Sequence, residues 1–218
     1  MHAGPDTVTV NLKLIGRYNV FNAMAAAGVG LILGMDLDAI GHGLESLSGV
    51  PGRMQRIDMG QPFNVIVDYA HSPASLEQTL DLARSVTDGR LIAVSGSAGE
   101  RDQGKRPVQG EVSARMAEFS IFTSEDPRFE DPVQILRDIA AGAESAGGKQ
   151  GVDFVIVENR RDAIELAIDS AQPGDTVLLA GKGHETCMIY GDLRVPWNEA
   201  LEVSDALRRR GFHEADRE

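Results

Sequence analysis

Four polar turns carry the residues of this sequence that could bind a charged ligand. Each turn follows a short apolar run, and the turns occupy residues 68–73, 96–107, 124–130 and 181–185. Arginine and lysine side chains bind carboxylates and phosphates through charge-assisted hydrogen bonds, and flexible glycine backbone adds amide donors. Aspartate and glutamate can pair with ammonium groups. One such turn is ordinary, but four that converge on one edge of a sheet indicate a binding site.

The longest turn reads Gly-Ser-Ala-Gly-Glu-Arg-Asp-Gln-Gly-Lys-Arg-Pro and contains the pattern G-x-x-x-x-G-K from Gly99. A nucleotide P-loop needs a serine or threonine after the lysine to bind Mg²⁺, and Arg106 stands there instead. The turn is therefore not a P-loop. Its two arginines and its lysine favour binding of a carboxylate or phosphate, and a solvated turn between a strand and a helix is the alternative interpretation.

Single residues in these turns also have structural interpretations. His71 could begin a helix with its ring hydrogen-bonded locally, Arg128 could form surface ion pairs of little energetic value, and Glu185 could cap a helix. Their shared place at strand ends favours a role in binding.

The composition is that of a globular protein. The chain has 218 residues, of which 42% are hydrophobic and 25% charged, enough to bury a sizeable core. A net charge of −12 argues against nonspecific binding of nucleic acid. No apolar run approaches the roughly 18 residues of a membrane span, and the first residues lack the basic and apolar regions of a signal peptide. We therefore expect a cytoplasmic protein with no nucleic-acid or membrane partner. The single cysteine, Cys187, can form neither an internal disulfide nor a thiolate metal site, and we expect no metal site in this chain.

Short runs rich in β-branched residues alternate with longer amphipathic segments, which is typical of βαβ units and an α/β fold. The expected strands are Phe63–Asp68, Leu91–Ser95, Ser120–Thr123, Phe154–Val157 and Thr176–Ala180. The expected helices are Pro73–Ser85, with Ser72 as N-cap, Pro132–Ala143 and Arg161–Ala171. Right-handed crossovers would bring all five strand ends to one edge of a mostly parallel sheet with helices on both faces.

The first 50 residues differ in pattern from the rest. Residues 19–33 and 37–47 have helical spacing, Val8–Leu14 is one possible strand, and the Gly49-Val50-Pro51-Gly52 cluster looks like a linker. These helices expose apolar faces with little to pack on. We interpret the segment as the end of a larger domain, with a boundary near Gly49.

Six motifs, taken in order, resemble those in the C-terminal portion of the Mur ligases, and within that family the ligases that add the third amino acid, diaminopimelate or lysine. The motifs are Gly16-Arg17-Tyr18-Asn19-Val20-Phe21-Asn22, Gly49-Val50-Pro51-Gly52-Arg53-Met54, Asp68-Tyr69-Ala70-His71-Ser72-Pro73, the turn at residues 96–107, Glu125-Asp126-Pro127-Arg128, and Ala180-Gly181-Lys182-Gly183-His184-Glu185. The resemblance implies that residues 1–48 are a C-terminal remnant of the ATP-binding central domain. Residues 49–218 would then be the Rossmann-like C-terminal domain that presents the amino acid.

The resemblance implies an ATP-dependent amide ligase of peptidoglycan synthesis, and through it a role in cell shape and division. In this family a substrate carboxylate takes the γ-phosphate of ATP, and the amine of the incoming amino acid attacks the acyl phosphate. The implied substrates are a UDP-muramoyl dipeptide, UDP-N-acetylmuramoyl-L-alanyl-D-glutamate, and a diamino acid. The full-length enzyme would use ATP and Mg²⁺. The P-loop and metal-binding acids would belong to the missing N-terminal and central domains, so we expect no catalytic residue here and no activity from the isolated chain.

The resemblance also assigns roles residue by residue. The nucleotide-binding residues would be Asn19, Asn22, Arg53, Asp68 and His71, with the asparagines near the adenine, Asp68 accepting from ribose hydroxyls and His71 towards the phosphates. The pocket for the incoming amino acid would comprise Arg101, Glu125, Asp126, Arg128, Gly181 and Glu185. Arg128 would bind a distal carboxylate and Glu185 a distal ammonium.

Selectivity depends on two residues that pull in opposite directions. Family members that add diaminopimelate usually have asparagine at the position of Asp126, and an added negative charge there favours an ammonium, as in lysine or ornithine. Arg128 favours a second carboxylate, because a distal end without one would leave its charge unpaired. On balance we predict meso-diaminopimelate.

Two other classes of function fit parts of the sequence. A noncatalytic module that binds a nucleotide or an amino acid would also lack the P-loop. A dinucleotide-dependent oxidoreductase is disfavoured, because no G-x-G-x-x-G follows the first strand of the predicted sheet with an acid about 20 residues later.

Overall fold

The computed structural model describes residues 2–3 and 6–213, and the chain divides into two compact units, Met1–Val50 and Pro51–Glu218. We describe each unit separately. No helix among the described residues has the length and apolar character needed to cross a bilayer. The assignment of the first unit to a central domain stays a prediction.

The first unit contains two helices, α1 (Arg17–Ile32) and α2 (Leu37–Ser46), and a short antiparallel pair, β1 (His2–Ala3) and β2 (Asp6–Thr7). Both predicted helices are present. Helix α2 begins where the side chain of Asp36 accepts a hydrogen bond from the backbone N–H of Ala39, a standard N-cap. Large apolar side chains of α1 and the following turn are exposed, including Phe21, Met24, Val29, Ile32 and Leu33.

The strand predicted at Val8–Leu14 is wrong. Its apolar side chains do alternate, half-buried, with exposed polar ones, but the segment forms no strand in the described part of the chain. It runs instead along α2, where a Cβ added to Gly41 would lie 3.2 Å from Val8 Cγ2 and where Asn11 N donates to Glu45 Oε1 at 2.7 Å. Apolar residues at every second position indicate that one face of an extended segment is buried. A helix can cover that face as well as a sheet can.

The second unit is built on a six-stranded sheet. Its order is β3 (Gln55–Arg56), β4 (Asn64–Asp68), β8 (Thr176–Ala180), β5 (Leu91–Ser95), β6 (Phe119–Phe122) and β7 (Phe154–Ile156). The edge strand β3 is antiparallel to β4, and the other five strands are parallel. The predicted α/β class, the five strands and their common direction are confirmed.

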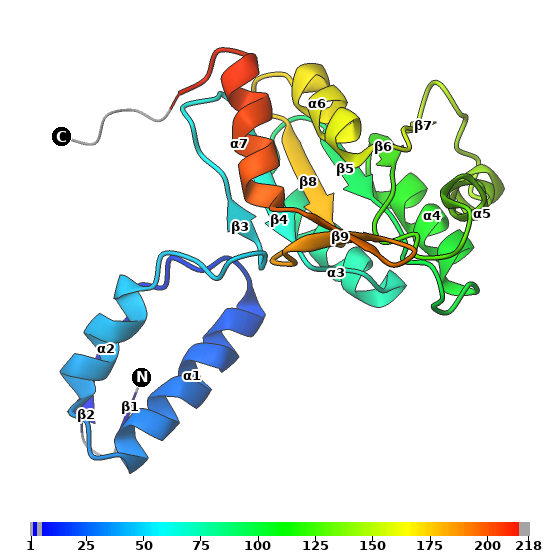
Figure 1. The fold of residues 1–218 in the computed structure, drawn as a ribbon. Coiled ribbons are helices and arrows are strands. Elements are labelled where there is room, and N and C mark those ends of the chain that lie inside the picture. The colour runs from blue at the N-terminus through cyan, green and yellow to red at the C-terminus, as the bar shows by residue number, and fades with distance from the viewer. Residues whose placement is uncertain (1, 4–5, 214–218) are drawn as a thin grey trace. The chain divides into compact units, whose positions relative to one another are not determined.

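Helices cover both faces of this sheet, as predicted (Figure 1). On one face lie α6 (Arg160–Ser170) and α7 (Glu199–Arg209), which bury alanine, valine and isoleucine against alternate residues of β4, β5 and β8. On the other lie α3 (Pro73–Arg84), α4 (Lys105–Met116) and α5 (Pro132–Ser145). The predicted start of α3 is confirmed, because the Ser72 hydroxyl accepts from Ser75 N at 3.2 Å and Pro73 is the first helical residue.

Helices α4 and α5 touch backbone to backbone at two glycines. A Cβ on Gly110 would lie 1.8 Å from the carbonyl oxygen of Ile139, and one on Gly142 would lie 1.8 Å from that of Pro107. Side chains at these positions would push the helices apart. The contact therefore holds the start of α4, and the glycine turn before it, against α5.

A hairpin of β9 (Cys187–Tyr190) and β10 (Leu193–Pro196), not among the predicted strands, forms its own two-stranded sheet. Every residue of β10 is exposed, so no buried face marks it in the sequence. The hairpin follows directly on the polar turn at residues 181–185 and lies beside the site described next.

Candidate functional site

The carboxyl ends of four parallel strands bring the four polar turns to one edge of the sheet, as predicted. The turns after β4 and β8 are joined by a hydrogen bond from Gly181 N to Asp68 O at 3.1 Å. Those after β5 and β6 are joined by one from Gly99 N to Asp126 O at 2.8 Å. The resulting edge is the candidate functional site.

Lys182 is the centre of this edge, although the sequence analysis gave it no role. Its side chain is fully buried, and Nζ donates to Asp126 Oδ1 at 2.8 Å, to Glu185 Oε2 at 2.6 Å and to the carbonyl oxygen of Cys187 at 2.7 Å. Burial lowers the pKa of Lys182, but the hydrogen bonds and charges of Asp126 and Glu185 outweigh it, and the pKa is raised. The lysine is therefore a permanent cation that joins two of the predicted binding residues.

Glu125 is a buried acid next to this cluster. Its Oε2 has no hydrogen-bond donor within the described residues, and a Cβ on Gly181 would lie 2.5 Å from it. Burial raises the pKa of Glu125, and the nearby charges of Arg160, Lys105 and Lys182 only partly oppose that rise. Gly181 is needed both for this close approach and for its φ of 109°.

Arg128 lies beside the hairpin in a strained backbone conformation. Its φ is 54°, and its N–H donates to Ile189 O at 3.0 Å while its carbonyl accepts from Gly191 N at 2.7 Å. Nε is buried without an acceptor, and none of the ion pairs among the described residues includes this guanidinium. Arg128 thus keeps its charge available to a ligand.

The glycine turn offers fewer cations than its sequence suggested. Arg106 is fully buried and donates to Glu130 Oε2 at 2.7 Å and to Asp138 Oδ2 at 3.0 Å, so it cannot also bind a ligand. Lys105 donates to the carbonyl oxygen of His71 at 2.9 Å. Arg101 is exposed, and it is the arginine of this turn that remains for binding.

A tyrosine that the sequence analysis did not assign lies among cationic and ring side chains. The Tyr69 ring centroid is 4.7 Å from that of His71, 5.0 Å from that of His184, and 4.8 Å from the guanidinium carbon of Arg53. Its hydroxyl donates to Glu185 Oε1 at 3.5 Å. Burial, and then the charges of Glu185 and Glu125, raise the pKa of Tyr69. Tyr69 therefore links the nucleotide residues predicted here, Arg53 and His71, to the predicted amino-acid pocket.

Asp68 is held in an internal network. Its carboxylate is buried and accepts from Met54 N at 2.8 Å, from Ala70 N at 2.8 Å and from Thr79 Oγ1 at 3.3 Å. These bonds tie the segment before β3 to the end of β4. A contact between this carboxylate and a ribose stays a prediction, and it would have to share oxygens that already have three donors.

Asn19 and Asn22 lie in the first unit, on α1. Asn19 Nδ2 donates to Ile15 O at 2.7 Å, and Asn22 Nδ2 donates to Asn19 Oδ1 at 3.1 Å. The asparagines are thus neighbours of each other, and their predicted role at an adenine is separate from the geometry of the second unit.

A buried ion pair stabilises the strand ends that carry the site. Arg160, at the start of α6, binds Glu199 of α7 with both side chains fully buried, and its closest N–O distance is 2.6 Å. The same guanidinium donates to Ala180 O at 2.9 Å and to Ser124 O at 3.3 Å. It therefore holds the ends of β6 and β8, and with them the turns that carry Asp126 and Lys182.

Strained backbone also gathers at this edge. The described residues other than glycine with positive φ are Met54 at 44°, Glu100 at 55° and Arg128 at 54°. Glu100 and Arg128 belong to turns of the candidate site, and Met54 N donates to Asp68 at the same edge. Such conformations cost free energy and tend to persist at functional sites, where surrounding contacts hold them.

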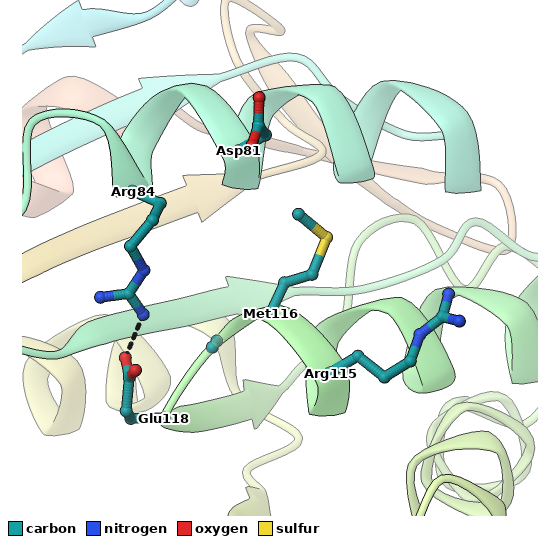
Figure 2. A pocket seen from close by; sticks show the side chains of 6 residues that line it. Asp81, Arg84, Arg115, Met116 and Glu118 are labelled. Atoms are coloured by element: carbon teal, nitrogen blue, oxygen red, sulfur yellow. Dashed lines mark hydrogen bonds and ion pairs between the residues drawn. The ribbon is translucent and has the colours of Figure 1, made fainter.

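A hollow of about 340 Å³ lies at the opposite edge, near the starts of the parallel strands (Figure 2). It lies between the ends of α3 and α4, and Figure 2 shows the ion pair of Arg84 and Glu118 on one side of it. No group of three or more metal-binding side chains occurs among the residues that the structure describes.

Comparisons with known proteins identify the family of this chain. Residues 52–183 match the family model described as Mur ligase, glutamate ligase domain. The chain is 49% identical to the UDP-N-acetylmuramyl-tripeptide synthetase of Roseiflexus sp. (strain RS-1), over 92% of this chain and 40% of that protein. It is 44% identical to the UDP-N-acetylmuramoyl-L-alanyl-D-glutamate--2,6-diaminopimelate ligase of Bacillus velezensis, over 92% of this chain and 38% of that protein.

A solved structure of a UDP-N-acetylmuramoyl-L-alanyl-D-glutamate--2,6-diaminopimelate ligase is similar with a TM-score of 0.70 and 36% identity, over 92% of this chain and 40% of that one. The chain thus spans about two fifths of the length of these relatives, 40% and 38% in the two sequence comparisons. The resemblance read from the six motifs is confirmed: the chain belongs to the Mur ligase family.

Proposed function

We propose that this chain is the carboxyl-terminal part of an ATP-dependent ligase that adds meso-diaminopimelate to UDP-N-acetylmuramoyl-L-alanyl-D-glutamate. Relatives that cover nearly the whole chain are named as ligases of this kind. The rest of the protein would supply the P-loop, the Mg²⁺ site and the site for the UDP-sugar. The isolated chain would then bind ligands without joining them, and the whole enzyme would work in the cytoplasm.

The observation that carries this proposal is the guanidinium of Arg128, which has no ion pair within the described part of the chain and lies beside a set of buried, mutually bonded charges. A diamino acid with a distal carboxylate supplies the anion that Arg128 lacks, through charge-assisted hydrogen bonds. Glu185 is partly exposed and can accept from the distal ammonium. Arg101 and Gly181 would complete the pocket.

The nucleotide would lie at the other end of the same edge. Arg53 and His71 carry donors towards solvent beside the ring of Tyr69, which suits the phosphates of ATP. The chemistry depends on placing the amine against an acyl phosphate, so this domain would contribute by holding and orienting the amino acid.

Arg128→Ala in the full-length protein tests the proposal. Losing hydrogen bonds between charged groups should raise the KM for meso-diaminopimelate about ten- to a hundredfold and leave the KM for ATP nearly unchanged. Arg137→Ala, which removes an exposed arginine of α5, is the matched control. Calorimetric titration of the chain itself with meso-diaminopimelate, lysine and ornithine would show whether the pocket is preformed. An unchanged KM for diaminopimelate in Arg128→Ala would remove Arg128 from the pocket.

A further inference from the structure

Lys182 has no free hydrogen-bonding capacity. An ammonium has three donors, and here they go to Asp126, Glu185 and the carbonyl oxygen of Cys187, at 2.6 to 2.8 Å. The side chain is fully buried, so the ammonium cannot turn to meet a ligand without losing one of these bonds. While these bonds hold, Lys182 cannot donate a hydrogen bond to the ligand, so it acts on the ligand through its charge and through the two acids.

The carboxylates of Asp126 and Glu185 are also hydrogen-bonded within the protein. Asp126 Oδ1 accepts from Lys182 and also from Ile189 N at 3.0 Å. Glu185 accepts from Lys182 through Oε2 and from the Tyr69 hydroxyl through Oε1. The two negative charges thus share one buried cation, Lys182.

The balance matters because the guanidinium of Arg128 forms no ion pair with the residues that the structure describes. With Lys182 in place, the pocket presents a positive charge at Arg128 and an acid at Glu185 whose charge is partly compensated. Without Lys182, two full negative charges would stand near any ligand carboxylate, at distances where like charges repel strongly in a partly buried site.

Resting on the proposed function, we propose that Lys182 is a positioning residue that sets amino-acid selectivity. By neutralising Asp126 and orienting Glu185, it lets Arg128 select an amino acid whose distal end carries a carboxylate as well as an ammonium. Loss of the Lys182 charge then shifts the pocket towards diamino acids with a distal ammonium alone.

The test compares kcat/KM for meso-diaminopimelate and for lysine in the full-length ligase. In Lys182→Met, the ratio of the two should fall about tenfold or more, because the pocket gains a net negative charge. In Asp126→Asn, the ratio should rise, because Lys182 then opposes one acid instead of two. Asp126→Asn is nearly isosteric, so it keeps the test informative if Lys182→Met does not fold.

The double variant Lys182→Met with Asp126→Asn separates selectivity from structure. It restores the charge balance while leaving the lysine absent, so the ratio should return towards the wild-type value. Lys149→Met, which removes an exposed lysine from the turn between α5 and β7, should leave the ratio unchanged. Melting temperatures of all variants give the structural cost of each change separately.

Three results would overturn the inference: an unchanged ratio in Lys182→Met, an unchanged or lower ratio in Asp126→Asn, and no recovery in the double variant. Each leaves the proposed function standing if the wild-type protein still ligates a diamino acid. A wild-type protein that ligates no diamino acid with ATP would instead remove the proposed function, and this inference with it.

Discussion

At the starts of the parallel strands, Asp175 accepts from Arg90 N and Nη2, both at 2.8 Å, and from Gln172 N at 3.0 Å. At the ends of the same strands, Glu125 is equally buried but its Oε2 has no donor within the described residues. Burial raises the pKa of both acids, yet the hydrogen bonds and the charge of Arg90 outweigh burial at Asp175 and lower its pKa, whereas the pKa of Glu125 stays raised. At the amino-terminal edge of the sheet, the Asp175 carboxylate is hydrogen-bonded within the fold. At the carboxyl-terminal edge, the Glu125 carboxylate has an oxygen without a donor among the described residues.

The two edges differ in what they can offer to a ligand. A carboxylate surrounded by donors contributes to the stability of the folded chain and has little left for a ligand. An acid or guanidinium held in place without a full set of partners lowers stability, but a ligand can supply what is missing. Asp175 at the amino-terminal edge is thus structural, whereas Glu125 and Arg128 at the carboxyl-terminal edge are candidates for function.

Arg160→Met should have the largest effect on stability, because it removes the guanidinium that binds Glu199 and the ends of β6 and β8. The substitution leaves Glu199 buried without its cation, which should cost about 3–5 kcal/mol of unfolding free energy. Urea unfolding of the chain measures it. Adding Glu199→Gln should recover a large part of the loss, and a double variant as unstable as the single one would show that the guanidinium acts through Ser124 and Ala180 instead.

Asp175→Asn should have an intermediate effect on stability. The effect should be confined to the edge at the starts of the parallel strands. It removes a charged acceptor of several hydrogen bonds and should cost about 1–3 kcal/mol at neutral pH. Because the folded pKa of Asp175 is lowered, its contribution is present above its ordinary value of 3.8 and is lost as pH falls through the folded pKa. The stability of the variant should therefore decline less on acidification.

Unfolding curves at several pH values check this, with Asp88→Asn, which alters an exposed acid near the same edge, as the control. Equal acid sensitivity in wild type and Asp175→Asn would mean that other carboxylates carry the pH dependence.

Glu125→Gln should have the smallest effect, and of opposite sign. The folded pKa of Glu125 is raised, so its contribution is full below its ordinary value of 4.5 and is lost as pH rises through the folded pKa. A glutamine stays neutral, so the variant should be slightly more stable than wild type at neutral pH, with the gain shrinking towards pH 4.

The same unfolding curves measure this gain, and Glu144→Gln, on the exposed side of α5, is the control. A variant less stable than wild type at neutral pH would indicate that Glu125 is ionised and paired in the folded chain, as Asp175 is.

Much of this architecture could be predicted from the sequence because two signals mark the end of a strand: the apolar run stops, and a glycine follows. The runs Leu91–Ser95 and Thr176–Ala180 are apolar and end at glycine, so both their class and their limits were predictable. The turns that follow them could be placed at one edge because parallel strands share a direction.

The direction of single side chains could not be read in this way. Arg106 and Arg101 stand in one charged turn, yet one is buried against Glu130 and Asp138 and the other is exposed. The Lys182 side chain is buried, and besides Glu185 in its own turn it binds Asp126, which is 56 residues away in sequence. Such contacts depend on tertiary neighbours, which local pattern does not encode.

The hairpin of β9 and β10 has a consequence for dynamics. It lies outside the six-stranded sheet, and its backbone bonds with Arg128 and the carboxylate of Asp126 run through Ile189 and Gly191. Segments of this kind can open locally while the core stays folded. Each such excursion would release Arg128 and Asp126 together. Under the proposed function, the closed fraction of the hairpin would scale the apparent affinity of the pocket, because a ligand would bind only the closed form.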